Sequence, residues 1–264
     1  MLPSTHGGEK IAAQLSTEIF GKNTIYFKQI TSTNDYLKKI LTDDTPEGTL
    51  ILAEEQTAGR GRFDRRWIAP PRSSLLTSLL FRPDFLPPNR AQLLTMVCAL
   101  AVTDAIAEQT GITAGLKWPN DVIFGGKKLA GILTELGIVG ERLDWVIVGM
   151  GLNVNIDFSA AEPALAETAT SLQTIAGRAV PRGGLLPAYL LAVEKRYNAL
   201  RRGESPLAEW RSRLETLGQS VQVNTPQGVV SGVAEDVSDS GALLLRRDDG
   251  RIEEILAGDV GGSL

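Results

Sequence analysis

Cysteine and histidine are almost absent from this sequence, whose 264 residues contain one of each. A single thiol excludes an intramolecular disulfide and is typical of a reducing compartment. Cys98 lies in the apolar segment LLTMVCALAV, so we expect a buried residue that behaves as a small hydrophobe. His6 precedes any recognisable helix or strand, and we expect it to be a surface residue without a catalytic role.

The scarcity of these two residues also limits the chemistry that the chain can perform. It argues against Ser-His-Asp and Cys-His catalysis and against a zinc site built from cysteine and histidine. Catalysis would have to use lysine, arginine, carboxylates, amides and the backbone, which stabilise charge rather than shuttle protons through an imidazole.

Long apolar segments are lacking as well. The longest covers about ten residues, which is too short to cross a bilayer. The N-terminal segment MLPSTHGGEK has neither the basic start nor the apolar stretch of a signal peptide. The net charge of −4 and the pI of about 5.3 argue against general binding to nucleic acid or acidic lipid. We therefore expect a cytoplasmic protein that binds neither nucleic acid nor a membrane.

The remaining composition is that of a globular protein, with 43% apolar and 22% charged residues. Strands and helices alternate up to Gly218, which predicts an α+β domain with a mixed β-sheet and flanking helices. Short alternating strands separated by turn residues follow and predict a small, SH3-like β-barrel. We expect a domain over 1–218, with 1–20 as a possible disordered leader, and a β domain over 219–264.

Periodicity and turn residues place the elements of the larger domain. Strands are predicted over 24–29, 48–56, 73–81, 115–124, 127–136 and 145–155. Gly125-Gly126 predicts a hairpin between the fourth and fifth of these strands. Helices are predicted after a cap at Ser32 or Thr33, from a capping Asn89 to Gly111, over 184–202, and from Ser205-Pro206 to Gly218.

The first segment that could carry chemistry is rich in arginine: EEQTAGRGRFDRRWIAPPR, residues 54–72. From Arg60 to Arg72 it has five arginines against one acid, Asp64, a local balance of +4. Gly59 and Gly61 let the backbone turn and approach a ligand, and arginine binds phosphate or carboxylate in a bidentate manner. The segment fits a loop that folds over an anionic ligand. A solvated basic loop or an RNA-binding loop would have the same composition.

The second segment is KWPND, residues 117–121. Lys117 provides a point charge, Pro119 makes the turn rigid, and Asn120 and Asp121 provide oxygen ligands. This combination suits a nucleotide phosphate with Mg²⁺, which prefers oxygen ligands. An Asx turn at the end of a strand is the simpler alternative.

Two further segments contain glycine within strands. KKLAGI places Lys128 at a strand start and Gly131 inside the strand, although a lysine at such a position is often a solvated edge residue. In GMGLNVN, residues 149–155, the glycines suggest close approach of a ligand or another backbone. Asn153 could meet a phosphate or simply end the strand. No G-x-G-x-x-G motif opens a helix here, so a dinucleotide fold is not indicated.

In order and spacing, these segments closely resemble the catalytic domain of biotin–protein ligases. The matching segments are TSTN at 31–34, EEQTAGRGR at 54–62, Trp67, SLLTSLLFRP at 74–83, KWPNDV at 117–122, KKLAGILTE at 127–135 and GMGLNVN at 149–155. The similarity covers about residues 20–264, including a small C-terminal β domain. The implied fold is shared with lipoate ligases and class II aminoacyl-tRNA synthetases.

The resemblance also implies residue roles. The biotin pocket falls on Ser32, Thr33, Asn34, Gln56, Arg60, Gly61, Arg62, Lys128 and Gly131. The ATP side falls on Arg62, Arg65, Trp67, Lys117, Asn120, Asp121 and Asn153, with Asp121 as a ligand for Mg²⁺. The catalytic roles fall on Arg62, Lys117, Asp121 and Lys128.

The sequence departs from the family pattern in two places. Many members have a Gly-Arg pair before the tryptophan, where this chain has Phe63-Asp64-Arg65-Arg66, so Asp64 replaces a flexible glycine. Some bacterial members also carry an N-terminal winged helix-turn-helix domain. Only residues 1–23 precede the first predicted strand, so we expect a form without that domain.

The implied activity is the activation of biotin with ATP and Mg²⁺ to biotinyl-5′-AMP, followed by transfer to a lysine of the biotin carboxyl carrier protein of acetyl-CoA carboxylase or a similar enzyme. The biotin carboxylate is already ionised near neutral pH, so adenylation needs no histidine base. The alternatives are a lipoate–protein ligase and a non-catalytic nucleic-acid-binding regulator. A homodimer is a further expectation from the resemblance.

Overall fold

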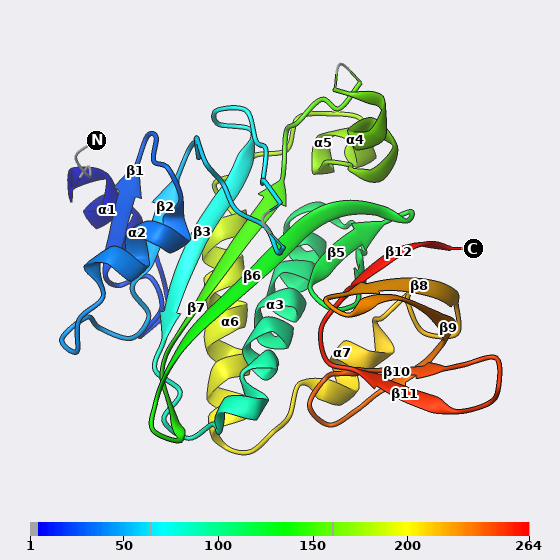
Figure 1. Cartoon of the computed structure of the whole chain (residues 1–264). Coiled ribbons are helices and arrows are strands. Elements are labelled where there is room, and N and C mark those ends of the chain that lie inside the picture. Colours follow the sequence, from blue (N-terminus) through cyan, green and yellow to red (C-terminus); the bar gives the residue numbers. More distant parts are fainter. Residues whose placement is uncertain (1–4, 64, 160, 264) are drawn as a thin grey trace.

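The computed structural model describes residues 5–63, 65–159 and 161–263. Its larger part is a seven-stranded mixed sheet in the order β1-β2-β3-β7-β6-β5-β4 (Figure 1). The β1–β2 pair is parallel and the other neighbours are antiparallel. The strands are β1 (Thr24–Phe27), β2 (Leu50–Ala53), β3 (Ser74–Phe81), β4 (Gly115–Lys117), β5 (Asp121–Phe124), β6 (Lys127–Val139) and β7 (Arg142–Asn153).

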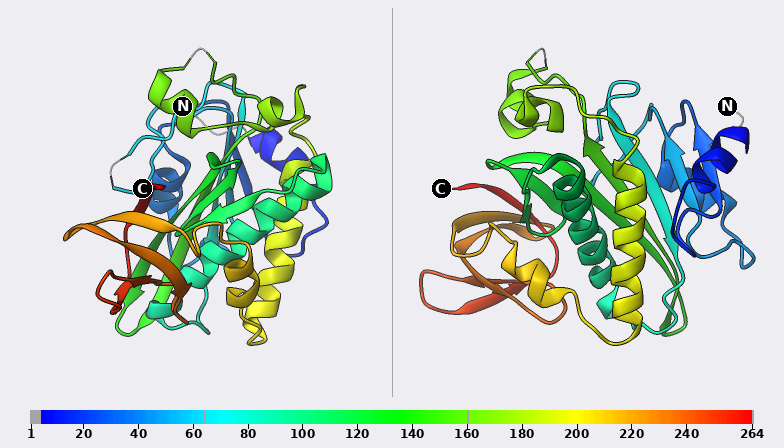
Figure 2. Two further views of the ribbon diagram at one scale, coloured as in Figure 1. Left: turned by 90° about the vertical axis from the view of Figure 1, so that its right-hand side faces the viewer. Right: turned by 180° about the vertical axis from the view of Figure 1, so that it is seen from behind.

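Helices cover both faces of this sheet, which confirms the predicted α+β class (Figure 2). The long helices α3 (Gln92–Thr110) and α6 (Leu185–Arg201) pack on one face, and the short helix α2 (Thr33–Ile40) lies on the other. Alternation along β7 separates the two cores, because successive side chains of a strand point to opposite faces. Val146 and Val148 join the core with α3 and α6, whereas Ile147 joins the smaller core with Leu37 of α2.

Helix α3 is the only described stretch that is long and apolar enough to cross a membrane. Together with the short 3₁₀ turn η1 (Pro88–Arg90) it spans Pro88–Thr110, with a mean hydropathy of 1.4. However, 78% of its most apolar window is buried inside the fold. Cys98 is fully buried in this helix, as predicted, and burial raises the pKa of its thiol to about 12. α3 is therefore a core helix.

Of residues 1–20, which the sequence left open as a possible disordered leader, the structure describes 5–20; residues 1–4 lie outside the described residues. Residues 5–12, including His6, form helix α1 (Thr5–Ala12), which lies against β1. Phe20 is fully buried. The carboxylate of Glu194 on α6 accepts backbone N–H bonds from Glu18 at 2.6 Å and Ile19 at 2.7 Å, which ties this segment to the core.

Three local predictions also need correction, and two short helices were missed. Asn89 lies in η1 and does not cap α3, whose preceding residue Ala91 makes no side-chain cap bond. The predicted strand 115–124 is divided into β4 and β5, because Pro119 has no backbone N–H to donate to a ladder. The last predicted helix is shorter than expected, α7 (Leu207–Ser212), and two short helices were not predicted, α4 (Pro163–Thr168) and α5 (Leu172–Ala176).

The C-terminal module is all β, as predicted. It is a five-stranded antiparallel sheet in the order β11-β10-β9-β8-β12. The strands are β8 (Ser220–Thr225), β9 (Gly228–Val237), β10 (Leu243–Arg246), β11 (Ile252–Ile255) and β12 (Asp259–Ser263). It lies beside the β5 side of the large sheet (Figure 1).

Trp118 joins the two sheets. Its side chain is 2% exposed, and its indole Nε1 donates to the carbonyl of Gly241 at 2.9 Å. Its backbone N–H donates to Oγ1 of Thr216, also at 2.9 Å. The tryptophan of KWPND is thus an anchor for the C-terminal module.

Candidate functional site

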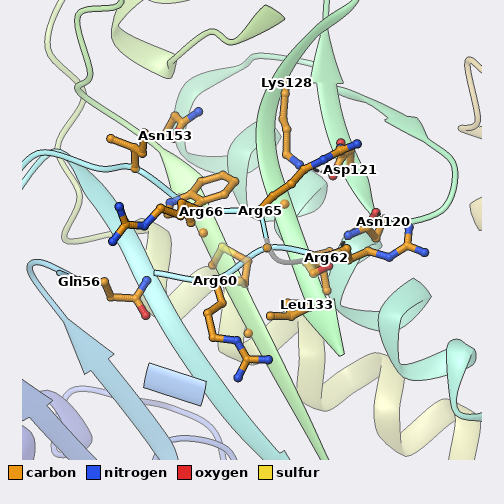
Figure 3. A pocket seen from close by; sticks show the side chains of 18 of the residues that line it. Gln56, Arg60, Arg62, Arg65, Arg66, Asn120, Asp121, Lys128, Leu133 and Asn153 are labelled. Carbon is orange, nitrogen blue, oxygen red and sulfur yellow. Dashed lines mark hydrogen bonds and ion pairs between the residues drawn. The ribbon is translucent and has the colours of Figure 1, made fainter. Parts of the chain in front are cut away.

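One pocket lies on the sheet face opposite α3 and α6, under the arginine-rich loop that follows β2 (Figure 3). All but one of the predicted site residues line it: Ser32, Thr33, Asn34, Gln56, Arg60, Gly61, Arg62, Arg65, Trp67, Asn120, Asp121, Lys128, Gly131 and Asn153. Lys117 does not line this pocket. It pairs with Asp121 across β4 and β5, so its role stays a prediction.

Glycines of neighbouring strands form the floor of the pocket. Gly131 of β6 and Gly151 of β7 are directly paired, and both face Trp67 of the loop. A Cβ on Gly151 would lie 2.5 Å from the Trp67 ring, and a Cβ on Gly149 would lie 2.3 Å from Oδ1 of Asn34. The alternation that buries Val148 therefore aims Gly149 and Gly151 at the site, where only glycine leaves room for the ring and the amide.

An irregularity in β6 brings Lys128 to the same place. The register between β5 and β6 shifts at Val122/Ile123, so that Lys128 and Ala130 face consecutive residues of β5. This extra residue lets Lys128 and Gly131 approach the same face although they are three positions apart. Lys128 Nζ lies 3.1 Å from the position of a Cβ on Gly131, and 5.7 Å from the centre of the Trp67 ring.

The start of α2 supplies a fixed polar wall. Ser32 caps the helix by accepting the backbone N–H of Asp35, as predicted, and Oε1 of Gln56 accepts bonds from the backbone and the hydroxyl of Thr33 at 2.8 and 3.0 Å. Ser78 of β3, which was not predicted, donates to Thr33 Oγ1 at 2.7 Å. These bonds hold TSTN and Gln56 in one arrangement.

Glu135 organises the next part of the wall and was also missed. Its carboxylate accepts bonds from Asn34 Nδ2, Lys38 Nζ and Arg60 Nη2, each at 2.9 Å. Burial alone would raise the pKa of Glu135, but the bonds from Lys38 and Asn34 outweigh it and hold the pKa below its ordinary value. Arg60 also pairs with Asp35. The first loop arginine is therefore tied to α2 and β6.

The second and third loop arginines meet a carboxylate of the C-terminal module. Nη1 of Arg62 lies 3.1 Å from Oδ1 of Asp259, and Nη1 of Arg65 lies 2.8 Å from Oδ2 of the same residue. Arg62 Nη1 also donates to Asn120 Oδ1 at 3.4 Å (Figure 3). Burial lowers the pKa of Arg62, and Asp259 opposes this shift.

The loop itself forms a tight turn. Gly61 donates its backbone N–H to Arg65 at 2.7 Å, and Trp67 donates to Gly59 at 2.9 Å. Phe63 adopts a positive φ of 51°, a backbone conformation that is uncommon for residues other than glycine. Asp64, the departure from the family glycine, lies outside the described residues.

The carboxylate predicted to bind Mg²⁺ is paired with a lysine. Asp121 Oδ1 lies 2.7 Å from Lys128 Nζ, and the two side chains point toward one another (Figure 3). The described residues contain no group of three or more histidine, cysteine, aspartate or glutamate side chains that could hold a metal ion. Since Mg²⁺ in nucleotide sites takes one or two carboxylates and completes its shell with phosphate and water, Asp121 fits only as a single shared ligand.

The remaining wall is apolar, and two of its polar atoms have no partner. Phe158, Leu165 and Ala169, from the unpredicted segment around α4, line the pocket beside Lys128 and belong to one small apolar cluster. Trp67 Nε1 and Thr77 Oγ1 line the pocket and are buried without a hydrogen-bond partner. Orphaned buried donors are rare in folded proteins and indicate a site that a ligand would complete.

Comparisons with known proteins agree on one family. The model described as "Biotin/lipoate A/B protein ligase family" matches residues 26–153, and the model "Biotin protein ligase C terminal domain" matches 216–260. The bifunctional ligase/repressor BirA of Bacillus subtilis is 36% identical over 260 residues, covering 98% of this chain and 79% of that protein. The biotin–[acetyl-CoA-carboxylase] ligase of Mycobacterium tuberculosis is 36% identical over 238 residues, covering 88% of this chain and 86% of that protein.

Solved structures give the same result. The biotin protein ligase of Aquifex aeolicus, in complex with biotin and ATP, has a TM-score of 0.77 and 32% sequence identity to this chain. The match covers 91% of this chain and 98% of the other.

Proposed function

The chain belongs to the biotin protein ligase family, and we propose that it joins biotin to ATP as biotinyl-5′-AMP and then transfers the biotinyl group to a lysine of a carrier protein. The observation that carries this proposal is the gathering of Arg60, Arg62, Arg65 and Lys128 around one pocket with a glycine floor. We assign biotin to the end of the pocket at Thr33 and Gln56, and the nucleotide to the end at Asn120 and Asp121.

The first step brings two anions together. A biotin carboxylate oxygen attacks the α-phosphorus of ATP, the bond between that phosphorus and the α,β-bridging oxygen breaks, and pyrophosphate leaves with the electron pair. The attacking carboxylate is already ionised at neutral pH, so the step needs no general base. Repulsion between carboxylate and triphosphate is the obstacle, and the guanidinium groups of Arg62 and Arg65 would reduce it by a few kcal/mol.

Mg²⁺, when bound with ATP, would supply further neutralisation of the phosphate charge. Asp121 would hold it as the single protein carboxylate, and Lys128 would then exchange its partner Asp121 for the oxygens of the ligand. The pairing of Lys128 with Asp121 thus keeps the ammonium in the site, beside the Trp67 ring.

In the second step the uncharged amine of the carrier lysine attacks the acyl carbon of the mixed anhydride. An amide bond forms, the bond to the AMP oxygen breaks, and the amine loses a proton to solvent or to the leaving phosphate. We propose that Lys128 stabilises the negative charge that develops, and that the loop over residues 59–66 shields the anhydride from hydrolysis.

Two observations favour biotin over lipoate as the acid. The family model that covers the catalytic domain includes ligases of both kinds, so it does not separate them. The C-terminal domain model is specific to biotin protein ligases, and the relatives named above are biotin ligases. The M. tuberculosis relative is named for acetyl-CoA carboxylase, and we propose a biotin carboxyl carrier domain of that kind as the partner.

The proposal is tested by incubating the protein with ATP, Mg²⁺, biotin and a biotin carboxyl carrier domain, and by weighing the carrier. We expect the mass of one biotinyl group on the acceptor lysine and none on a carrier with that lysine changed to arginine. A second arm replaces biotin with lipoic acid. If the carrier were labelled with lipoic acid and not with biotin, a lipoate ligase would be favoured. Salt-sensitive DNA or RNA binding without ATP turnover would favour a regulator.

A further inference from the structure

Asp259 is the one described acidic residue of the C-terminal module that lines the pocket. It begins β12, which pairs with β8 through Asn224. Its carboxylate is 15% exposed, so it lies largely out of water although it comes from a different sheet. The loop that it touches lies almost two hundred residues earlier in the chain, with a separation of 197 positions between Arg62 and Asp259.

The contact uses one carboxylate oxygen for each arginine. Oδ1 accepts from Arg62 and Oδ2 pairs with Arg65, in both cases through Nη1. The backbone carbonyl of Gly258 accepts a further bond from Arg62 Nη1 at 3.0 Å. Among the described residues, the hydrogen bonds and ion pairs of the Arg62 and Arg65 guanidinium groups use Nη1. Each guanidinium has five N–H donors, so Nε and Nη2 of both arginines remain available to a ligand.

The two arginines need such a partner. Arg62 is half-buried, and the charge of the more exposed Arg65 is close enough to disfavour its charged form. A carboxylate placed between them cancels this repulsion and fixes the direction of both side chains. The C-terminal module is itself held in place by Trp118, whose indole donates to Gly241.

We propose that Asp259 is a positioning residue for adenylate formation: it bridges Arg62 and Arg65 and holds the loop over residues 59–66 in the form that receives ATP. This inference rests on the proposed function, since it assigns the two arginines to the nucleotide. It gives the C-terminal module a role within the catalytic site. The proposal is incompatible with the opposite case, in which Asp259 competes with the triphosphate of ATP for Arg62 and Arg65.

The test compares Asp259→Asn with a matched control, Asp236→Asn. Asp236 also belongs to the C-terminal module and pairs with an arginine of the larger domain, Arg211 Nε at 2.5 Å, but far along the chain from the loop. ATP–pyrophosphate exchange in the presence of biotin gives KM for ATP and kcat, and equilibrium dialysis gives the affinity for biotin alone. Trypsin, which cleaves after arginine, reports the closure of the loop.

We expect Asp259→Asn to raise KM for ATP about ten- to a hundred-fold, because charge-assisted hydrogen bonds are lost, and to change kcat less. Tryptic cleavage between Arg60 and Arg66 should become faster, biotin affinity should stay within about two-fold, and Asp236→Asn should match the wild type. An unchanged KM with unchanged cleavage overturns the proposal. A lowered KM overturns it as well, because it would show competition between Asp259 and ATP.

A thermal melt accompanies each variant. If Asp259→Asn melts well below the wild type, the comparison moves to Asp259→Glu, which keeps the charge, and the proposal then requires a KM within about three-fold of the wild type. A larger rise in KM overturns it. Exchange by the wild-type protein tests the proposed function separately. A wild type without biotin-dependent exchange contradicts the proposed function, whereas an unexpected result in the Asp259 variants alone contradicts the role of Asp259.

Discussion

Lys128 Nζ and Asp121 Oδ1 form an ion pair at 2.7 Å between the adjacent strands β6 and β5, with both side chains in the wall of the pocket. An unpaired ammonium of this kind would be free to leave a ligand-free site, and an unpaired carboxylate would repel the anions that bind there. The pair therefore keeps each group in place until a ligand with phosphate oxygens offers Lys128 another partner.

We predict that Lys128→Ala loses most of its carrier-labelling activity, by about a hundred-fold or more, because the charge that develops at the acyl group loses its stabilising cation. The measurement is the rate of carrier labelling from preformed biotinyl-AMP. The neighbouring Lys127, which is exposed and donates to the carbonyl of Ala166 at 2.9 Å, provides the control. A wild-type rate for Lys128→Ala would remove this residue from the site.

We predict that Arg62→Ala sharply weakens the formation or retention of the adenylate, also by about a hundred-fold, since a guanidinium is lost where phosphate charge must be neutralised. Pyrophosphate release and the lifetime of bound biotinyl-AMP measure the effect. Arg202→Ala is the control, because the side chain of Arg202 lies at the surface, where it pairs with Glu204. If both quantities were unchanged in Arg62→Ala, the assignment would be wrong.

We predict that Gly151→Ala impairs ligand binding, because its new Cβ would lie 2.5 Å from the Trp67 ring and would displace it. Calorimetric titration with biotin and then with ATP should show affinity reduced by about ten-fold or more. Gly183→Ala is the matched control, since a Cβ there meets nothing within 4 Å. Equal affinities for the two variants would contradict the role of the glycine floor.

We predict a pH-dependent loss of stability in Glu135→Gln. The folded pKa of Glu135 lies below its ordinary value of 4.5, so its contribution is present above that pH and is lost as pH falls through the folded pKa. At pH 7 the substitution should lower the free energy of unfolding by about 1–2 kcal/mol, because three hydrogen bonds lose their charged acceptor.

Urea unfolding of the wild type and Glu135→Gln should therefore differ at pH 7 and converge as the pH falls through the folded pKa of Glu135. Glu204→Gln is the control, because Glu204 is 64% exposed and should show no difference at either pH. A constant difference between the wild type and Glu135→Gln across this range would exclude the carboxylate charge as the cause.

The cytoplasmic location, the absence of nucleic-acid binding and a homodimer stay predictions. Carrier specificity likewise depends on the experiment with the carrier domain.

Local sequence patterns were sufficient for much of the fold. The apolar, β-branched strand β7, the cap at Ser32 and the hairpin at Gly125-Gly126 depend on neighbouring residues, so they could be predicted directly. The errors occurred where the local sequence gives no clear signal for the secondary structure. Pro88 starts a 3₁₀ turn before α3, and the short helices α4 and α5 have too few turns to show a clear periodicity.

The sequence by itself determined which short segments carry charge, glycine and amide groups, and fourteen predicted residues do meet at one pocket. Only the tertiary structure decided their partners. Glu135 lies 101 positions from Asn34, and Asp259 lies 197 positions from Arg62. A motif records what is adjacent along the chain, whereas the partner of a buried charge is whichever group the packing of distant sheets brings within hydrogen-bonding distance.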